Sequence, residues 1–192
     1  MRYLYFPLGY KPEGSSKSDD YLQYAEVYKD VIQFLFQKFS EEPPIHDYSL
    51  APILFLLRQY IELQLKGIII YGEYSAEVIG THDIVFLYEK AMKAIEEKYG
   101  TDMLGEPDKD AEKFIYALGS FDKKGELGRY PETREGVAFF DLIKEMDPWL
   151  HDKIRSFSAL SEIAEKVIED LEGMEGYLDN MSDNEEESLA NY

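Results

Sequence analysis

Three charged side chains within one apolar segment are the first candidates for chemistry in this sequence. Arg58, Glu62 and Lys66 follow one another at intervals of four residues within residues 50–71, which are otherwise rich in Ile, Leu, Phe and Tyr. In an α-helix this spacing places all three on one face, with a drift of about 40° per step. A helix that is apolar elsewhere belongs in a core, so its charged stripe must point at an opening, a partner or other charges.

Two interpretations of this stripe stay open at the level of sequence. The stripe is either an ordinary solvent-exposed face, held by ion pairs worth ~0.2–0.5 kcal/mol each, or a place where Arg58 and Glu62 line a polar site or a dimer seam. Residues 50–71 also approach the length of a membrane-spanning helix. Three charges near the middle make insertion expensive, so we expect a buried helix and no membrane association.

The chain has three histidines, and one of them is placed to meet the charged stripe. His46 lies in a proline-bounded loop, and His151 lies near the start of the last predicted helix. His82 opens the helix that follows the stripe, so its ring can reach Arg58 or Glu62, where a protonatable group would be useful. The simpler expectation is that this ring bonds to the backbone at the helix start. The three are scattered without ligand spacing, so we predict no metal site.

Other motifs for chemistry are weak. No glycine-rich phosphate loop precedes a helix and no Ser-His-Asp arrangement stands out, while Gly125 and Gly128 form a lone pair. We therefore predict no cofactor. The absence of cysteine excludes disulfides, thiolate zinc sites and a cysteine nucleophile, and it fits a reducing cytoplasm.

Helical periodicity supplies the elements that must position these residues. The first predicted helix has Ser18 or Asp19 as its N-cap and ends before Pro43, and its inward stripe includes Tyr24 and Val31. The third has Thr81 as its N-cap. The predicted helices cover residues 18–42, 49–71, 81–99, 109–121 and 149–171.

These elements predict an all-α fold, an up-down bundle of about five helices with a small irregular or β insert at residues 122–140. We divide the chain into an extended segment at 1–17, a bundle at 18–172 and a disordered tail at 173–192. The segment from Glu172 onward has seven acidic residues and no basic one, and such composition cannot bury a core.

The net charge of −19 restricts the partners. Most of it lies outside the tail, so the bundle itself is strongly acidic. Such a surface repels phosphate backbones and favours a partner with a basic surface. We therefore expect no strong generic nucleic-acid binding.

The residues that carry the stripe also resemble a known family. The run from Pro52 to Gly67 resembles the signature helix of HEPN-like proteins, which often reads apolar-Leu-Leu-Arg-x-x-Ile-Glu-Leu-x-x-Lys. Thr81-His82-Asp83 followed by Leu87 is similar to their next element. Asp122, Gly125 and Arg129-Tyr130-Pro131 are similar to a later segment, and the matching pieces together span residues 49–131.

The resemblance implies a helical bundle, commonly dimeric, of prokaryotic toxin–antitoxin, abortive-infection and other antiphage systems. Many such proteins are metal-independent ribonucleases whose signature is an arginine followed four to six residues later by a histidine. No arginine of this chain has a histidine at that spacing. The arginines are Arg2, Arg58, Arg129, Arg134 and Arg155.

Two functions therefore compete, with a small-molecule or nucleotide-binding module as a third. The first is a non-catalytic, cytoplasmic HEPN-like interaction protein, an accessory, sensor or neutralising component of a defence system, which forms a homodimer and binds a basic protein. The second is a divergent metal-independent endoribonuclease that uses Arg58 and His82. The residues expected at the binding site or dimer seam are Arg58, Glu62, Lys66, His82, Asp83, Asp122, Arg129 and Tyr130.

Overall fold

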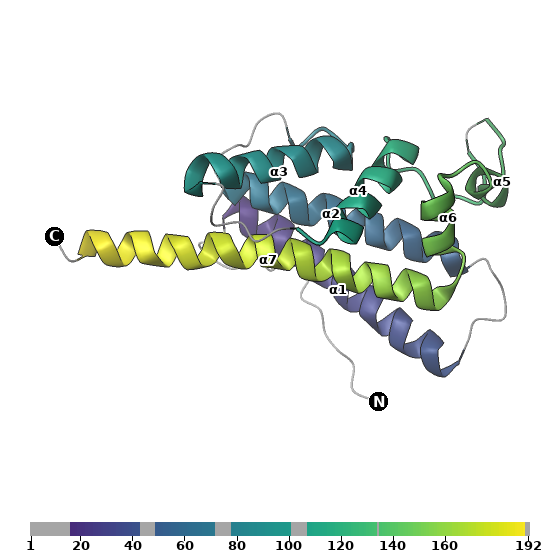
Figure 1. The fold of residues 1–192 in the computed structure, drawn as a ribbon, viewed down its shortest axis with the longest axis horizontal. Coiled ribbons are helices and arrows are strands. Elements are labelled where there is room, and N and C mark those ends of the chain that lie inside the picture. Colours follow the sequence, from purple (N-terminus) through teal and green to yellow (C-terminus); the bar gives the residue numbers. More distant parts are fainter. Residues whose placement is uncertain (1–15, 43–48, 72–77, 101–106, 134, 191–192) are drawn as a thin grey trace.

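The computed structural model of the chain describes residues 16–42, 49–71, 78–100, 107–133 and 135–190, and this part is all-α (Figure 1). The predicted fold class is confirmed, although the described ranges contain seven helices rather than about five. They are α1 (Lys17–Glu41), α2 (Leu50–Tyr71), α3 (Ile84–Tyr99), α4 (Lys109–Phe121), α5 (Phe139–Ile143), α6 (Pro148–Ile154) and α7 (Phe157–Ala190).

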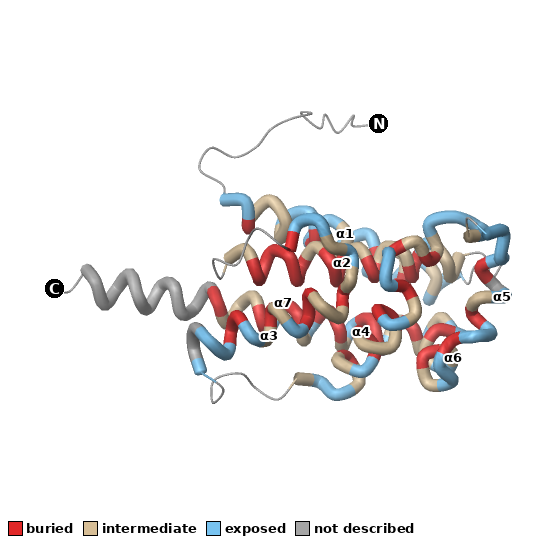
Figure 2. Tube along the Cα trace, turned by 90° about the horizontal axis from the view of Figure 1, so that it is seen from above, coloured by how far each residue is buried: buried red, intermediate tan, exposed pale blue. Residues whose placement is uncertain are grey.

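The long helices pack around α2, which is buried along most of its length (Figure 2). α1 and α2 approach closely because Gly67 carries no side chain, and a Cβ there would lie 2.4 Å from Leu22 Cδ2. Ser18 Oγ donates a hydrogen bond of 2.8 Å to the carbonyl oxygen of Gly67, so the start of α1 meets the end of α2. Phe36, near the end of α1, packs edge-on against Phe157 at the start of α7. α1 is thus antiparallel to both α2 and α7.

Two predicted N-caps differ from the structure. The cap of α1 is Ser16, outside the predicted boundary, because Ser16 and Asp19 exchange hydrogen bonds in a capping box. The cap of α3 is Asp83 rather than Thr81. The Asp83 carboxylate accepts from the backbone N–H groups of Val85 and Phe86 at 3.1 and 3.2 Å, and aspartate is a stronger cap than threonine.

The predicted last helix, residues 149–171, is two helices. α6 ends at Ile154 and α7 begins at Phe157, because the Ser156 side chain accepts a hydrogen bond of 3.1 Å from Ala159 N–H and so starts a new helix. The predicted boundary at residue 172 lies inside α7, which runs to Ala190. Met174 and Leu178 are buried, so they continue the apolar stripe of α7 beyond that boundary. Residues 173–178 therefore belong to the packed part of α7, and the expected disorder of residues 173–192 stays a prediction for the rest of that segment.

The described residues of the predicted insert at 122–140 contain very little β-structure. A single antiparallel bridge joins Glu132 and Ala138, and α5 follows immediately. The expected extended segment at 1–17 lies outside the described residues, apart from the first positions of α1 and its cap. None of the described helices has the length and apolar character needed to cross a membrane.

The inward stripe predicted for α1 is partly wrong. Ala25 and Ile32 are buried as expected, but Tyr24 and Val31 belong to the exposed side of the helix. α1 therefore has two apolar faces, and only one of them packs against the bundle.

Candidate functional site

Arg58 lies at the middle of α2 with its guanidinium fully enclosed by protein. Its Nη1 lies 3.0 Å from Glu62 Oε2, one turn further along the helix. Its Nη2 donates to the carbonyl oxygens of His82 and Asp122, and its Nε lies 3.1 Å from Asp122 Oδ2. All three guanidinium nitrogens are thus engaged by acceptors of the protein itself.

Glu62 and Lys66 continue the network along α2. Lys66 Nζ donates to Glu62 Oε1 at 2.8 Å and to the carbonyl oxygen of Ile79 at 3.3 Å. Burial alone would raise the pKa of the Glu62 carboxyl, but the hydrogen bond from Lys66 and the charges of Lys66, His82 and Arg58 lower it below the ordinary value. Glu62 is therefore a carboxylate held ionised between cations.

His82 is the solvent-facing member of this network. Its Nδ1 lies 3.0 Å from Glu62 Oε1, and 60% of its side chain is exposed. The ring therefore reaches Glu62, as one of the two predictions allowed, and among the described residues its contact is with this carboxylate rather than with backbone at the helix start. An exposed histidine with one ring nitrogen held by a buried carboxylate has the arrangement of a histidine general base.

Asp83 stands beside the network rather than within it. Its carboxylate caps α3, as described above, and this fixes the backbone at His82 whose carbonyl oxygen Arg58 needs. Its role in the structure is therefore to position the turn.

Asp122 closes the network from the end of α4. Its carboxylate accepts hydrogen bonds from the N–H groups of Glu126 and Leu127 at 2.9 and 3.1 Å, and it pairs with Arg58. The loop approaches so closely that a Cβ on Gly125 would lie 2.8 Å from Arg58 Nη1, and Gly125 has a φ of 67°. A turn through the left-handed region is thus part of how the site is built.

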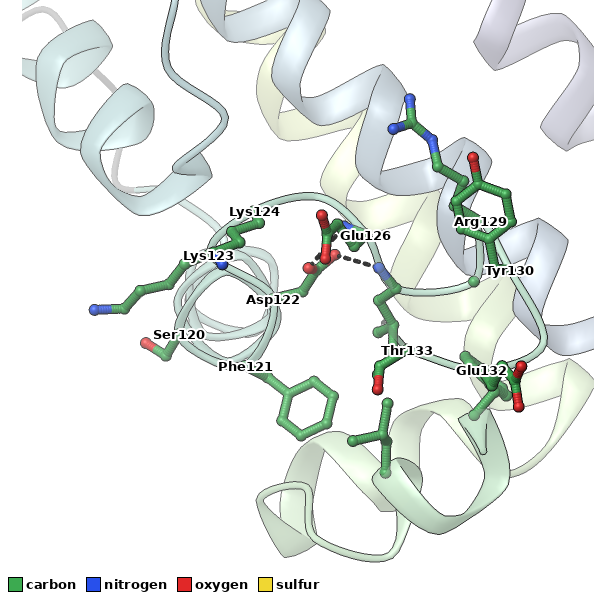
Figure 3. Close-up of a pocket in the computed structure, with 14 residues that line it drawn as sticks. Ser120, Phe121, Asp122, Lys123, Lys124, Glu126, Arg129, Tyr130, Glu132 and Thr133 are labelled. Atoms are coloured by element: carbon green, nitrogen blue, oxygen red, sulfur yellow. Dashed lines mark hydrogen bonds between the residues drawn. The ribbon is translucent and has the colours of Figure 1, made fainter. Parts of the chain in front are cut away.

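A hollow of about 460 Å³ adjoins this loop and shares Asp122 with the network (Figure 3). Arg129 and Tyr130 belong to its lining, so the three later residues of the predicted site gather here. In Figure 3 the side chains of Lys123 and Arg129 extend away from the hollow, and the Arg129 guanidinium lies 5.6 Å from the Phe55 ring centre. Phe121, Leu127, Phe139 and Leu142 supply apolar lining.

These contacts settle two earlier alternatives about the stripe. A solvent-exposed stripe is wrong, because Arg58, Glu62 and Lys66 are 0%, 4% and 3% exposed. A dimer seam built on them is wrong for the same reason, since a second chain cannot touch side chains that are already covered. The stripe points at other charges, and two cations face two anions, Glu62 and Asp122, in a balanced cluster.

The network has limited means for chemistry. His82 offers a base, but both nearby cations are buried and paired, so neither can meet a phosphate group without breaking the network. Among the described residues, no group of three His, Asp or Glu side chains is arranged to hold a metal ion.

Comparison of the chain with protein-family models, curated proteins and solved structures finds no match.

Two features of the site were not identified from sequence. The carbonyl oxygens of Ile79, His82 and Asp122 accept from the buried cations, and carbonyl groups carry no residue-specific signal. As a sequence motif, Gly125 and Gly128 indicate only a weak phosphate loop. Their spacing directly after Asp122 was the available signal for a tight turn against α2.

Proposed function

We propose that this protein is a non-catalytic HEPN-like interaction protein, an accessory, sensor or neutralising component of a prokaryotic antiphage or toxin–antitoxin system in the cytoplasm. The proposal that the protein is non-catalytic rests on Arg58, whose guanidinium is already fully engaged by other groups of the protein and whose side chain is 1% exposed. The resemblance of residues 49–131 to HEPN-like proteins supports the proposed family.

Cleavage of RNA without a metal needs a base for the 2′-hydroxyl and a cation for the phosphate charge. His82 supplies the base through its contact with Glu62. Arg58, the partner that a ribonuclease would need, instead joins α2 to the turn before α3 and to the loop after α4. The network is therefore better suited to holding the fold together than to catalysis.

The charge distribution supports a basic protein as the partner. A net charge of −19 raises the association rate with a positive surface and repels nucleic acid. We place the contact at the hollow beside Asp122, because Tyr130 stands at its edge with 65% of its surface exposed. Exposed aromatic side chains are common anchors of protein interfaces.

The catalytic alternative is tested by incubating the purified full chain with single-stranded RNA in the presence of a chelator. We expect no cleavage by the wild type and none by His82→Ala. His151→Ala is the matched control, since it removes a histidine far along the chain from the network. Cleavage by the wild type and by His151→Ala, together with its loss in His82→Ala, would replace this proposal with the ribonuclease.

The proposed interaction with a basic protein is tested with the purified product of the adjacent gene as the probe. We expect binding that weakens steeply as salt rises, and further weakening by Tyr130→Ala, whereas Gln33→Ala on exposed α1 surface leaves binding unchanged. Absence of binding, or binding that changes neither with salt nor with Tyr130→Ala, would overturn the proposed interaction.

A further inference from the structure

The outer face of α1 exposes four large apolar side chains in a row. Tyr24, Val27, Val31 and Phe34 are 64%, 61%, 41% and 64% exposed. They lie on the side of α1 away from Ala25 and Ile32, which pack into the bundle, and Figure 2 shows α1 at the margin of the molecule with much of its surface exposed. Exposed apolar residues are ordinary when scattered, but a continuous row marks an interaction surface.

This row belongs to a longer repeat that covers the whole helix. Alternating steps of three and four residues continue the row outward to charged residues at both ends of α1, which is the spacing of a coiled-coil seam. We call this set the outer seam, and its members are Lys17, Asp20, Tyr24, Val27, Val31, Phe34, Lys38 and Glu41.

The order of residue types along the outer seam is symmetric about its midpoint. Its centre is aromatic, valine, valine, aromatic, so an antiparallel copy places Tyr24 opposite Phe34 and Val27 opposite Val31. The ends match by charge. In the same register Asp20 lies opposite Lys38, which also bonds Glu42 of its own chain at 2.6 Å, and opposite charges therefore meet on both sides of the apolar centre.

The outermost pair follows the same rule, since Lys17 lies opposite Glu41. A surface that complements itself about one two-fold axis is what an isologous dimer requires. We propose that a second copy of this chain covers the outer seam, with the two α1 helices packed antiparallel about a two-fold axis that crosses the seam at the level of Lys29, whose own side chain faces α7 and pairs with Glu172.

The surface beside the outer seam fits this arrangement. A shallow depression of about 260 Å³ is lined by Asp20, Tyr21, Tyr24 and Leu63, at the end of the apolar row. The antiparallel register brings Phe34 of the second copy to this end of the row. Its ring would thus enter the depression as a knob enters a hole.

Size and charge set the strength of this dimer. Two helices of 25 residues meet over about 37 Å with a width of about 10 Å, which is small for a protein interface. We therefore expect micromolar rather than nanomolar association. Exposed ion pairs at the ends of the seam contribute little, whereas each copy carries a net charge of −19, so screening of that repulsion by salt should strengthen the dimer. Binding to a basic partner weakens with salt, so the two proposals can fail independently.

Sedimentation of the full chain over a range of concentrations tests the surface. We expect a monomer–dimer equilibrium that Val27→Lys shifts at least tenfold toward monomer, whereas Gln33→Lys, a matched exposed position off the seam, leaves it unchanged. Both positions are exposed, so circular dichroism should show the same helix content in both variants. A monomer at every concentration would overturn the proposal. The outer seam would then bind another part of this chain or a different protein.

Cross-linking tests the register, and the chain offers a clean background because it has no cysteine. Tyr24 lies ten residues from Phe34, so equivalent positions on the two copies would be about 15 Å apart along the axis, beyond the ~7 Å limit of a disulfide. Tyr24→Cys alone and Phe34→Cys alone should give little disulfide dimer under mild oxidation. A mixture of the two variants should give the mixed dimer. Efficient cross-linking of either variant with itself would indicate a parallel or unrelated contact and overturn the register.

Discussion

Arg58 Nε lies 3.1 Å from Asp122 Oδ2, although 64 positions separate the two residues in the sequence. The pair joins the middle of α2 to the loop that follows α4, and Glu62 and Lys66 extend the same cluster along α2. Removing one member of a buried cluster leaves its partners charged and uncompensated, which costs more than the pair contributes on balance.

Replacing Arg58 with methionine should therefore destabilise the protein strongly. Methionine keeps much of the volume but leaves Asp122 without its cation and Glu62 with Lys66 in place of two cations, and we expect a loss of about 3–5 kcal/mol. Denaturant unfolding measures this change. Arg155→Met is the control, because that side chain is 65% exposed and pairs with the exposed carboxylate of Asp152. Equal small effects of the two substitutions would show that the buried cluster is not a stabilising feature.

Gly128→Ala should destabilise the loop that carries Asp122. Gly128 has a φ of 75°, and a Cβ there would lie 2.1 Å from the carbonyl oxygen of Ala51. Strain of this kind costs on the order of 1–3 kcal/mol or more. Gly173→Ala within α7 is the matched control, since among the described residues no atom from outside this turn of α7 lies within 4 Å of the added Cβ. That control should stabilise by about 0.5–1 kcal/mol. Thermal melts distinguish the two signs.

Asp170→Asn should stabilise the protein at neutral pH. Burial raises the pKa of the Asp170 carboxyl, and nearby Asp108 and Glu112 raise it further, although a hydrogen bond from Asp108 N–H opposes them. A pKa raised in the folded state means that ionisation costs stability, so wild-type stability falls as pH rises through the folded pKa. Asparagine removes that loss. The advantage should disappear as pH falls to the ordinary value of 3.8.

Asp110→Asn provides the opposite sign for comparison. A hydrogen bond from Lys166 lowers the pKa of the Asp110 carboxyl, so its contribution is present above the ordinary value and is lost as pH falls. At neutral pH the melting temperature of Asp170→Asn should be higher than that of the wild type, and that of Asp110→Asn should be lower. Both differences should shrink as the pH of the measurement is lowered. A decrease for both would contradict the assignment of Asp170 as a destabilising charge.

Much of the helical framework could be predicted because its signals are local. α2 and α4 match the predicted segments closely, since apolar periodicity and flanking breakers define them without reference to the rest of the chain. The errors fall where two local signals compete. Ser156 lies within one continuous apolar stripe, and its capping hydrogen bond divides the predicted last helix in two.

The residues that belong to the candidate site could be predicted, but their burial could not. Helix geometry alone places Arg58, Glu62 and Lys66 on one face, because their spacing matches the turn of an α-helix. The sequence does not reveal whether that face meets water. That depends on the carbonyl oxygens of His82 and Asp122, which lie 24 and 64 positions away from Arg58.

The sequence by itself determined that this protein is an acidic helical bundle whose second long helix carries one charged stripe. Tertiary structure decided which faces are covered: the stripe is enclosed, and one apolar face of α1 is exposed. Periodicity is a property of neighbouring residues, whereas burial depends on segments that meet only after the chain has folded.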